Sequence, residues 1–95
     1  MSERDEIDLG DGHRMIFCDY EGQKRVAAHI QHQRRDGAYC VGFIPFKGRA
    51  WSNEFNGKIE EWDVVQDDPV TLSPSILCRA CGDHGFVRNG KWVRA

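Results

Sequence analysis

Short apolar runs separated by turn-forming residues recur along the chain from residue 14 onward. Residues 15–18 form the first run, and the apolar positions 26, 28 and 30 then alternate with 27, 29 and 31, as in a half-buried strand. Residues 39–46 are the most apolar stretch, and Pro45 marks its end because proline cannot donate to a strand ladder. This succession of short segments predicts an all-β meander or small barrel.

Turn signals predict two hairpins in the second half of the chain. Asn56-Gly57 favours a two-residue turn, with residues 59–65 as the returning arm. Residues 85–93 form a terminal hairpin around Asn89-Gly90. Residues 26–35 admit a short helix as an alternative to a strand, because periodicity alone cannot decide over ten residues. We favour the strand, so the expected fold is all-β, or β-rich with one short helix.

Length and composition indicate one domain. A chain of 95 residues lies just below the common domain size of about 100 to 150 residues, too short for two self-sufficient cores. Residues 1–12 are acidic and glycine-punctuated, and we expect a disordered tail there and a single β-rich domain over 13–95. No apolar run approaches the roughly 18 residues of a membrane-spanning helix. The acidic start lacks the basic and apolar parts of an export signal, which favours a cytoplasmic location.

The charge is uneven along a chain whose overall net charge is −2. Residues 1–11 carry a net charge of −4, and residues 78–95 carry +3. A net negative chain has no general attraction to nucleic acid, although a local basic face would have one. Solvated surface is the alternative explanation for both ends. The basic residues of the second segment are Arg79, Arg88, Lys91 and Arg94.

The clearest chemical signal is Cys78-x-x-Cys81, followed by Gly82 and His84. In a reducing cytoplasm such a pair is more typical of a metal site than of a disulfide. Two thiolates at this spacing reach one ion across a tight turn, and His84 is near enough for a third ligand. The sequence therefore predicts a zinc-knuckle-like C-terminal hairpin; a redox dithiol and unligated cysteines are the alternatives.

A structural zinc ion normally has four ligands, so at least one must come from elsewhere in the fold. The candidates are Cys18, His29, His32 and Cys40. On a strand His29 and His32 face opposite sides, so only one of them can take part. The two cysteines lie in apolar runs, where a free cysteine is commonly a small core residue. His13 is expected to be solvated.

The three tryptophans, Trp51, Trp62 and Trp92, are expected in the core of so short a chain, because each buries a large area. If the three tryptophans were exposed, they would instead mark a binding surface.

Two serines adjoin the cysteines in Ser73-Pro74-Ser75. No Gly-x-Ser-x-Gly motif surrounds either of them, and we see no triad context for an Asp or His, so we expect no nucleophile here. Their hydroxyls are expected to satisfy backbone groups near the knuckle. Asp83-His84 invites comparison with metal-dependent ββα nucleases, but too little chain follows for their helix.

The C-terminal half carries a distinctive run: Trp51, Phe55-Asn56-Gly57, residues 69–76 (Pro-Val-Thr-Leu-Ser-Pro-Ser-Ile), Cys78, and residues 81–90 (Cys-Gly-Asp-His-Gly-Phe-Val-Arg-Asn-Gly). With this run, over approximately residues 51–93, the chain resembles a family of small uncharacterised proteins of bacteria and their phages. The resemblance implies a small β-rich domain in a phage or mobile-element setting, with no established activity. Members often have a Cys-rich segment near the N-terminus that would complete a zinc-ribbon-like site, and this chain lacks a CxxC there.

The leading functional hypothesis is a zinc-stabilised, non-catalytic binding module on a host or phage protein. It rests on a closed Cys-rich site that shows no evident acid or base. One alternative is a nucleic-acid-binding zinc protein that uses the basic residues of 78–95. The other is a small metal-dependent hydrolase with an open coordination position, assisted by His84 or Asp83. The sequence leaves the identity of the protein partner and the oligomeric state open.

Overall fold

Antiparallel strands form the regular structure of the chain. The computed structural model describes residues 5–34, 36–49 and 60–95, and within these ranges it contains strands and no helix. The strands are β1 (Glu6–Gly10), β2 (His13–Tyr20), β3 (Gln23–Gln33), β4 (Tyr39–Pro45), β5 (Asp63–Asp67), β6 (Val70–Ser73), β7 (Ile76–Leu77), β8 (His84–Arg88) and β9 (Lys91–Arg94). The expected all-β fold is confirmed.

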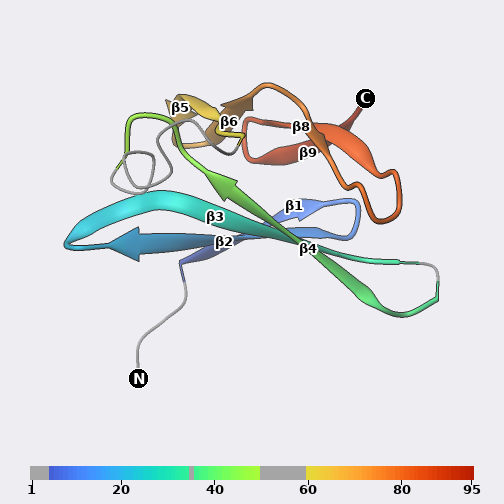
Figure 1. Cartoon of the computed structure of the whole chain (residues 1–95). Helices are drawn as coiled ribbons and strands as arrows, with labels where there is room; N and C mark the ends of the chain where they lie inside the picture. Colours follow the sequence, from blue (N-terminus) through green and yellow to red (C-terminus); the bar gives the residue numbers. More distant parts are fainter. Residues whose placement is uncertain (1–4, 35, 50–59) are drawn as a thin grey trace.

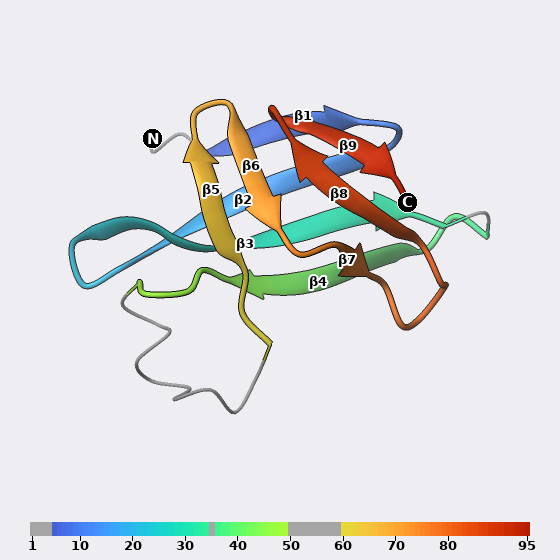
Figure 2. The same cartoon turned by 90° about the horizontal axis from the view of Figure 1, so that it is seen from above.

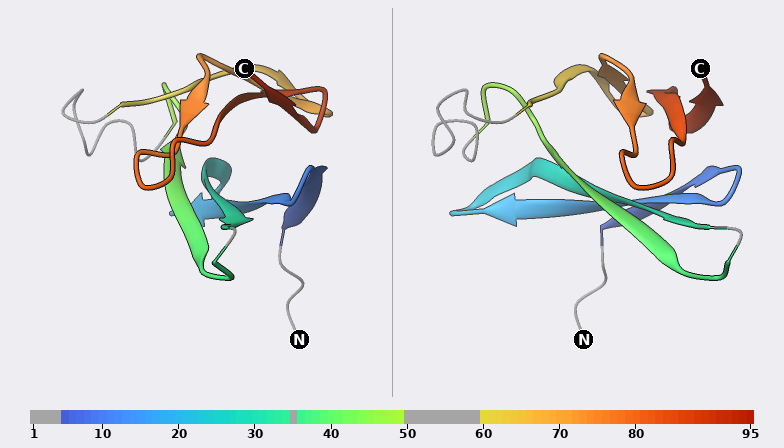
Figure 3. Two further views of the ribbon diagram at one scale, coloured as in Figure 1. Left: turned by 90° about the vertical axis from the view of Figure 1, so that its right-hand side faces the viewer. Right: turned by 45° about the vertical axis from the view of Figure 1, so that its right-hand side comes forward.

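The strands are arranged in two layers (Figures 1 and 2). One layer is a four-stranded sheet in the order β1-β2-β3-β4. The other consists of the pair β5-β6 and the sheet β7-β8-β9. The backbone N–H of Gly90 donates to the C=O of Val70 at 2.8 Å, which joins the β8–β9 turn to β6. The two further views in Figure 3 show the second layer crossing over the first.

The core fills the space between the two layers. On β3 the side chains of Ala28, Ile30 and His32 point inward, because alternate residues of a strand face the same side. The first layer contributes Leu9, Met15, Phe17, Ala28, Ile30, Ile44 and Phe46, and the second layer, with the residue preceding β5, contributes Trp62, Val70, Leu72, Ile76, Val87 and Trp92. The inner faces of the two layers thus pack against each other.

Several sequence predictions can be compared with these strands. Residues 26–35 were the ambiguous segment, and β3 shows a strand at Gln23–Gln33. The terminal hairpin is confirmed as β8 and β9, and the expected burial of Trp62 and Trp92 is confirmed, with 6% and 8% exposed. Trp51 and the Asn56-Gly57 turn lie outside the described residues.

The N-terminal segment differs from the expected disordered tail over Glu6–Gly10. This segment is β1, which pairs with β2, and Leu9 is 1% exposed in the core. Just before it, the Arg25 guanidinium donates to both carboxylate oxygens of Asp5, at 2.8 and 2.9 Å. This hydrogen bonding to Arg25 lowers the pKa of Asp5. Burial of Leu9 and the ion pair between Asp5 and Arg25 stabilise this segment, although its acidic composition is typical of a disordered tail.

Over the described ranges, the structure contains no helix that is long and apolar enough to cross a membrane.

Candidate functional site

Four metal-ligand side chains meet at one end of the two layers. The ligand atoms of His32, Cys40, Cys78 and Cys81 all lie within 4.8 Å of one another. His32 Nε2 is 3.1 Å from the Sγ of Cys81. Three sulfur atoms and one imidazole nitrogen form a donor set that suits borderline and soft divalent ions. This cluster could therefore hold a metal ion.

The first layer supplies two members of the cluster through strand register. His32 on β3 is directly opposite Cys40 on β4, so both side chains are on the same face of the sheet. That face is the inner one, and the two residues are 9% and 7% exposed. The expectation that Cys40 is a buried residue is met, and its thiol also belongs to the cluster.

The second layer supplies the other two members through the β7–β8 turn. The N–H of Gly82 donates to the C=O of Cys78 at 2.7 Å, and the N–H of Cys78 donates to the C=O of Asp83 at 2.7 Å. Gly82 has a φ of 81°, the left-handed conformation that glycine adopts without steric cost. Because Cys78 and Cys81 come from this layer, the cluster joins the two layers.

The thiols differ in their tendency to ionise. Burial, followed by hydrogen bonding to Cys78 and Cys81, raises the pKa of Cys40 to about 11. Burial acts to raise the pKa of Cys78, but backbone hydrogen bonds from Cys81 and Ala80, together with hydrogen bonds to the thiols of Cys81 and Cys40, outweigh it and the pKa is lowered. A divalent cation would remove the cost of neighbouring thiolates, since thiols that coordinate metals are deprotonated. The donor set therefore fits a cation.

The other two candidates for the fourth ligand lie on the opposite face of the first layer. Cys18 Sγ is 3.4 Å from His29 Nδ1, and the His29 ring is 5.3 Å from that of Phe43. The alternation along β3 that points His32 inward points His29 outward. Of the four candidates, His32 and Cys40 are therefore brought to Cys78 and Cys81, whereas Cys18 and His29 are not.

His84 lies apart from the cluster and contacts a serine. Its Nε2 is 2.8 Å from the Oγ of Ser75. Leu77 pairs with His84 across β7 and β8, so Ser75, two residues before Leu77, is on the same exposed face as His84. The indole N–H of Trp62 donates to the C=O of Ser75 at 3.2 Å and holds the serine backbone. Within the described residues, the other ring nitrogen of His84 makes no hydrogen bond.

Sequence reasoning missed this pair because it required a Gly-x-Ser-x-Gly motif. The spacing alone does not reveal the pair. The structure pairs Leu77 with His84, so Ser75 lies two residues along the chain from the position opposite His84. The register of β7 and β8 brings the two side chains together, and the sequence does not specify that register.

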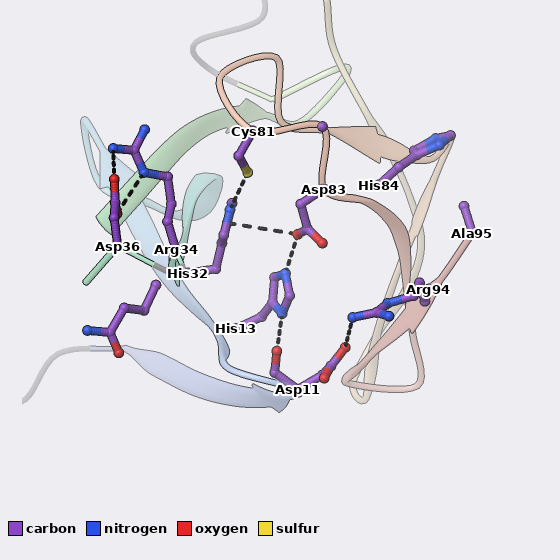
Figure 4. A pocket seen from close by; sticks show the side chains of 12 residues that line it. Asp11, His13, His32, Arg34, Asp36, Cys81, Asp83, His84, Arg94 and Ala95 are labelled. Atoms are coloured by element: carbon purple, nitrogen blue, oxygen red, sulfur yellow. Dashed lines mark hydrogen bonds and ion pairs between the residues drawn. The ribbon is translucent and has the colours of Figure 1, made fainter. Parts of the chain in front are cut away.

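A chain of polar contacts runs beneath the turn and is visible in Figure 4. The Nδ1–H of His13 donates to the C=O of Asp11 at 2.7 Å, and its Nε2 is 2.5 Å from a carboxylate oxygen of Asp83. The same oxygen is 3.9 Å from His32 Nδ1. His13 is thus buried at 5% exposed rather than solvated, and it stacks on Trp92 at 4.1 Å between ring centroids. An open cavity of about 890 Å³ adjoins this chain and His84.

The basic residues of the C-terminal segment are all exposed. The guanidinium of Arg88 lies over the ring of Phe86, 4.2 Å from its centroid, and Arg94 is 3.6 Å from a carboxylate oxygen of Asp11. Exposure of Arg79, Arg88, Lys91 and Arg94 is what the solvated-surface explanation expects.

Comparison with known proteins identifies one family. Residues 30–95 match the family model of BubE, described as a bacterial ubiquitination-like system serine protease. No curated protein and no solved structure matches the chain. The match agrees with the expected small bacterial family. It contradicts the predicted non-catalytic binding module in a phage setting, together with the nucleic-acid-binding and metal-dependent hydrolase alternatives, because the family is described as a serine protease.

Proposed function

This chain belongs to the BubE family of bacterial ubiquitination-like system serine proteases, and on that premise we propose that it hydrolyses protein substrates with Ser75 as nucleophile and His84 as general base. The observation that carries the proposal is the 2.8 Å contact between Ser75 Oγ and His84 Nε2. A serine hydroxyl is a weak nucleophile until an adjacent base accepts its proton, and this distance is within the range for that transfer.

The reaction follows from this geometry as an acyl transfer. His84 Nε2 accepts the hydroxyl proton while Ser75 Oγ bonds to the carbonyl carbon of the scissile bond. The protonated imidazole then gives the proton to the leaving amine, and an acyl-serine ester is left. Water attacks the ester carbonyl carbon and His84 accepts its proton. The imidazolium then gives this proton to Ser75 Oγ as the bond between Oγ and the carbonyl carbon breaks, which restores the hydroxyl and releases the carboxylic acid. The exposed face of the β7–β8 ribbon gives a polypeptide access to both groups.

We further propose that the cluster of His32, Cys40, Cys78 and Cys81 binds one structural zinc ion. Zinc prefers four protein ligands of this kind at structural sites, about 3.5 to 3.8 Å apart. The separations of up to 4.8 Å leave only small adjustments to be made. Cys78 follows Ser75 and Cys81 precedes His84, so an ion would fix the turn between nucleophile and base.

Kinetics of single-site variants test the catalytic roles. Ser75→Ala and His84→Ala each remove one partner of the pair, and each should lower kcat/KM for a cleaved substrate by roughly a thousandfold or more. Ser73→Ala is the matched control, since Ser73 is an exposed serine two residues upstream at the end of β6. We expect the control to stay within about twofold of the unmodified protein.

The opposite pattern would contradict the assignment. If Ser73→Ala abolished hydrolysis and Ser75→Ala retained it, the nucleophile would have been misassigned. Hydrolysis that survives both serine substitutions and His84→Ala would require a different reaction chemistry.

A further inference from the structure

The outward face of the sheet β7-β8-β9 carries its own set of side chains beside the proposed catalytic pair. Alternate residues of a strand share a face, and the inward set of this sheet is Ile76, Gly85, Val87 and Trp92. The outward set is Leu77, His84, Phe86, Arg88, Lys91 and Val93. No member of the outward set belongs to the core or to the proposed metal ligands. Figure 2 shows the sheet from this outward side.

Two apolar side chains of this face lie next to Ser75. Phe86 pairs with Val93 across β8 and β9. Ile76 pairs with Gly85, and the same register continued by one residue puts Ser75 next to Phe86. Phe86 is half-buried and Val93 is 37% exposed. A substrate side chain beside the bond that Ser75 attacks therefore meets an apolar surface.

Two cations adjoin this apolar surface. Arg88 and Lys91 are directly opposite each other across β8 and β9, where like charges repel. In the part of the chain that the structure describes, neither side chain forms an ion pair with a carboxylate. The guanidinium of Arg88 lies over the Phe86 ring, 4.2 Å from its centroid, so one positive charge is held beside the residue that adjoins Ser75. Complementary charge at this place is negative.

We propose that this face selects a substrate segment with an apolar side chain next to the cleaved bond and an acidic side chain further along. The apolar side chain contacts Phe86 and Val93. The acidic side chain pairs with Arg88 and Lys91, and its negative charge relieves the repulsion between them. The inference rests on the catalytic role proposed for Ser75 and names the class of peptide delivered to it.

Strand geometry sets the distance between the acidic side chain and the cleaved bond. Arg88 is two residues beyond Phe86 on the same face of β8, roughly 7 Å along the strand. A substrate that lies along β8 in an extended conformation has the same rise per residue. Because Phe86 adjoins Ser75, we expect the acidic side chain about two residues from the cleaved bond.

Matched peptides test the acidic preference on the unmodified protein. An internally quenched peptide library identifies a cleaved sequence, which is then made with Glu, Gln or Lys at each position near the bond. We expect Glu about two residues from the cleaved bond to raise kcat/KM about five- to tenfold over Gln, because it gains exposed ion pairs. The ratio of the two values should fall toward one as the salt concentration rises.

Two variants assign this preference to the outward face. The double variant Arg88→Gln/Lys91→Gln should bring the ratio between the Glu and Gln peptides to about one, and Lys91→Glu should favour the Lys peptide instead. Lys47→Gln is the control, because Lys47 is an exposed lysine that follows β4 in the first layer, and it should keep the ratio of the unmodified protein. Each ratio compares two peptides on one variant, so a variant of lower overall activity still gives a result.

Val93→Asp tests the apolar contact. It should lower the ratio of kcat/KM between peptides with Leu and with Ala next to the cleaved bond by about threefold or more, since the Leu side chain loses its apolar surface. Val65→Asp is the control, because Val65 is 65% exposed on β5, and β6 lies between β5 and β8 (Figure 2). The control should keep the ratio of the unmodified protein.

The reaction of Ser75 with a small fluorophosphonate probe, measured in parallel, separates failure of this inference from failure of the proposed function. Equal cleavage of Glu and Gln peptides at every position would overturn the acidic preference. A preference that survives the double variant would place the acidic side chain on another surface. A protein that reacts with the probe but cleaves no peptide would also overturn the inference. Failure of the unmodified protein to react with the probe would instead refute the proposed function.

Discussion

At the scale of single residues, Asp83 lies between the proposed metal cluster and the histidine of the proposed catalytic pair. Its carboxylate contacts His13 at 2.5 Å and is 3.9 Å from Nδ1 of His32, while its C=O accepts a hydrogen bond from Cys78. It also directly precedes His84 in the chain. At 3.9 Å the carboxylate is too far from His32 Nδ1 for a hydrogen bond, so it acts on that ring through its charge, whereas it bonds directly to His13. A nearby negative charge would favour a metal-bound His32 ring.

Replacing this carboxylate should weaken metal binding. Asp83→Asn is expected to lower the affinity for zinc, because the site loses a nearby negative charge, and competition with a chromophoric chelator measures the change. Asp36→Asn is the control, since Asp36 lines the same cavity but pairs with Arg34. Equal zinc affinities for Asp83→Asn and the unmodified protein would show that the charge of Asp83 does not act on His32.

Substitutions can distinguish the proposed metal ligands from the candidate residues that lie outside the cluster. Cys40→Ser should abolish stoichiometric zinc binding, because the ion would lose one of its four ligands. Cys18→Ser is the matched control, since Cys18 also contacts a histidine, His29, but on the opposite face of the sheet. Native mass spectrometry should detect one zinc per chain in the control and none in Cys40→Ser. Zinc bound to Cys40→Ser but not to Cys18→Ser would show that the metal binds on the outer face of the sheet, which would contradict the proposed ligand set.

The sequence alone identified some of the site residues and not others. Cys78 and Cys81 were identifiable because their spacing is local, and the cluster does include both. The alternation at 26, 28 and 30 places His32 and not His29 on the buried face of β3. The choice of Cys40 over Cys18 depended on the pairing of β3 with its neighbours, which the sequence does not specify. Ser75 was dismissed because the expected motif belongs to a strand-to-helix turn, whereas here the serine is on an edge ribbon.

At the scale of elements, the β8–β9 hairpin depends on a close approach at Gly85. A Cβ atom at this position would lie 2.5 Å from Cε2 of Trp92 and 2.8 Å from the C=O of Val93. Gly85 follows His84 and pairs with Ile76 on β7. The lack of a side chain therefore lets Trp92 pack directly under the ribbon that carries the serine and histidine.

Gly85→Ala should accordingly destabilise the protein. The added methyl group forces Trp92 or the backbone to shift, at a cost of roughly 1 to 3 kcal/mol in the free energy of unfolding. Gly42→Ala on β4 is the control, because a Cβ there meets nothing within 4 Å. Urea denaturation checks both variants. A Gly85→Ala midpoint no lower than that of Gly42→Ala would contradict the packing.

The strands were predicted better than the site because their signals are local. The apolar run at 15–18 and the Asn89-Gly90 turn correspond to β2 and to the β8–β9 hairpin. β1 was missed because its acidic composition resembles a tail, whereas its stability comes from burial of Leu9 against distant residues. Long-range packing of this kind overrides local composition.

At the scale of the molecule, the cluster connects the two layers. His32 and Cys40 belong to the four-stranded sheet, and Cys78 and Cys81 belong to the facing layer. Zinc binding would therefore add to the stability of the whole fold, since the free energy of binding at a structural site contributes to folding.

Removal of the metal should thus destabilise the whole protein. Chelation is expected to lower the melting temperature by at least about 5 to 10 °C, or to abolish the cooperative transition, because the ligands that join the two layers beside the apolar core are no longer held together. Differential scanning calorimetry with and without chelator measures the change, and restored zinc should reverse it. A chelated protein with an unchanged transition would refute a structural role for the metal.

The central claim is that Ser75 is a nucleophile activated by His84, and the most direct test is the site of reaction with a fluorophosphonate probe. Intact mass spectrometry followed by peptide mapping should find one adduct per chain, located on Ser75. His84→Ala should lose the adduct, because the hydroxyl then lacks its base. An adduct on Ser73, labelling that is independent of His84, or no adduct on the folded protein would contradict the account.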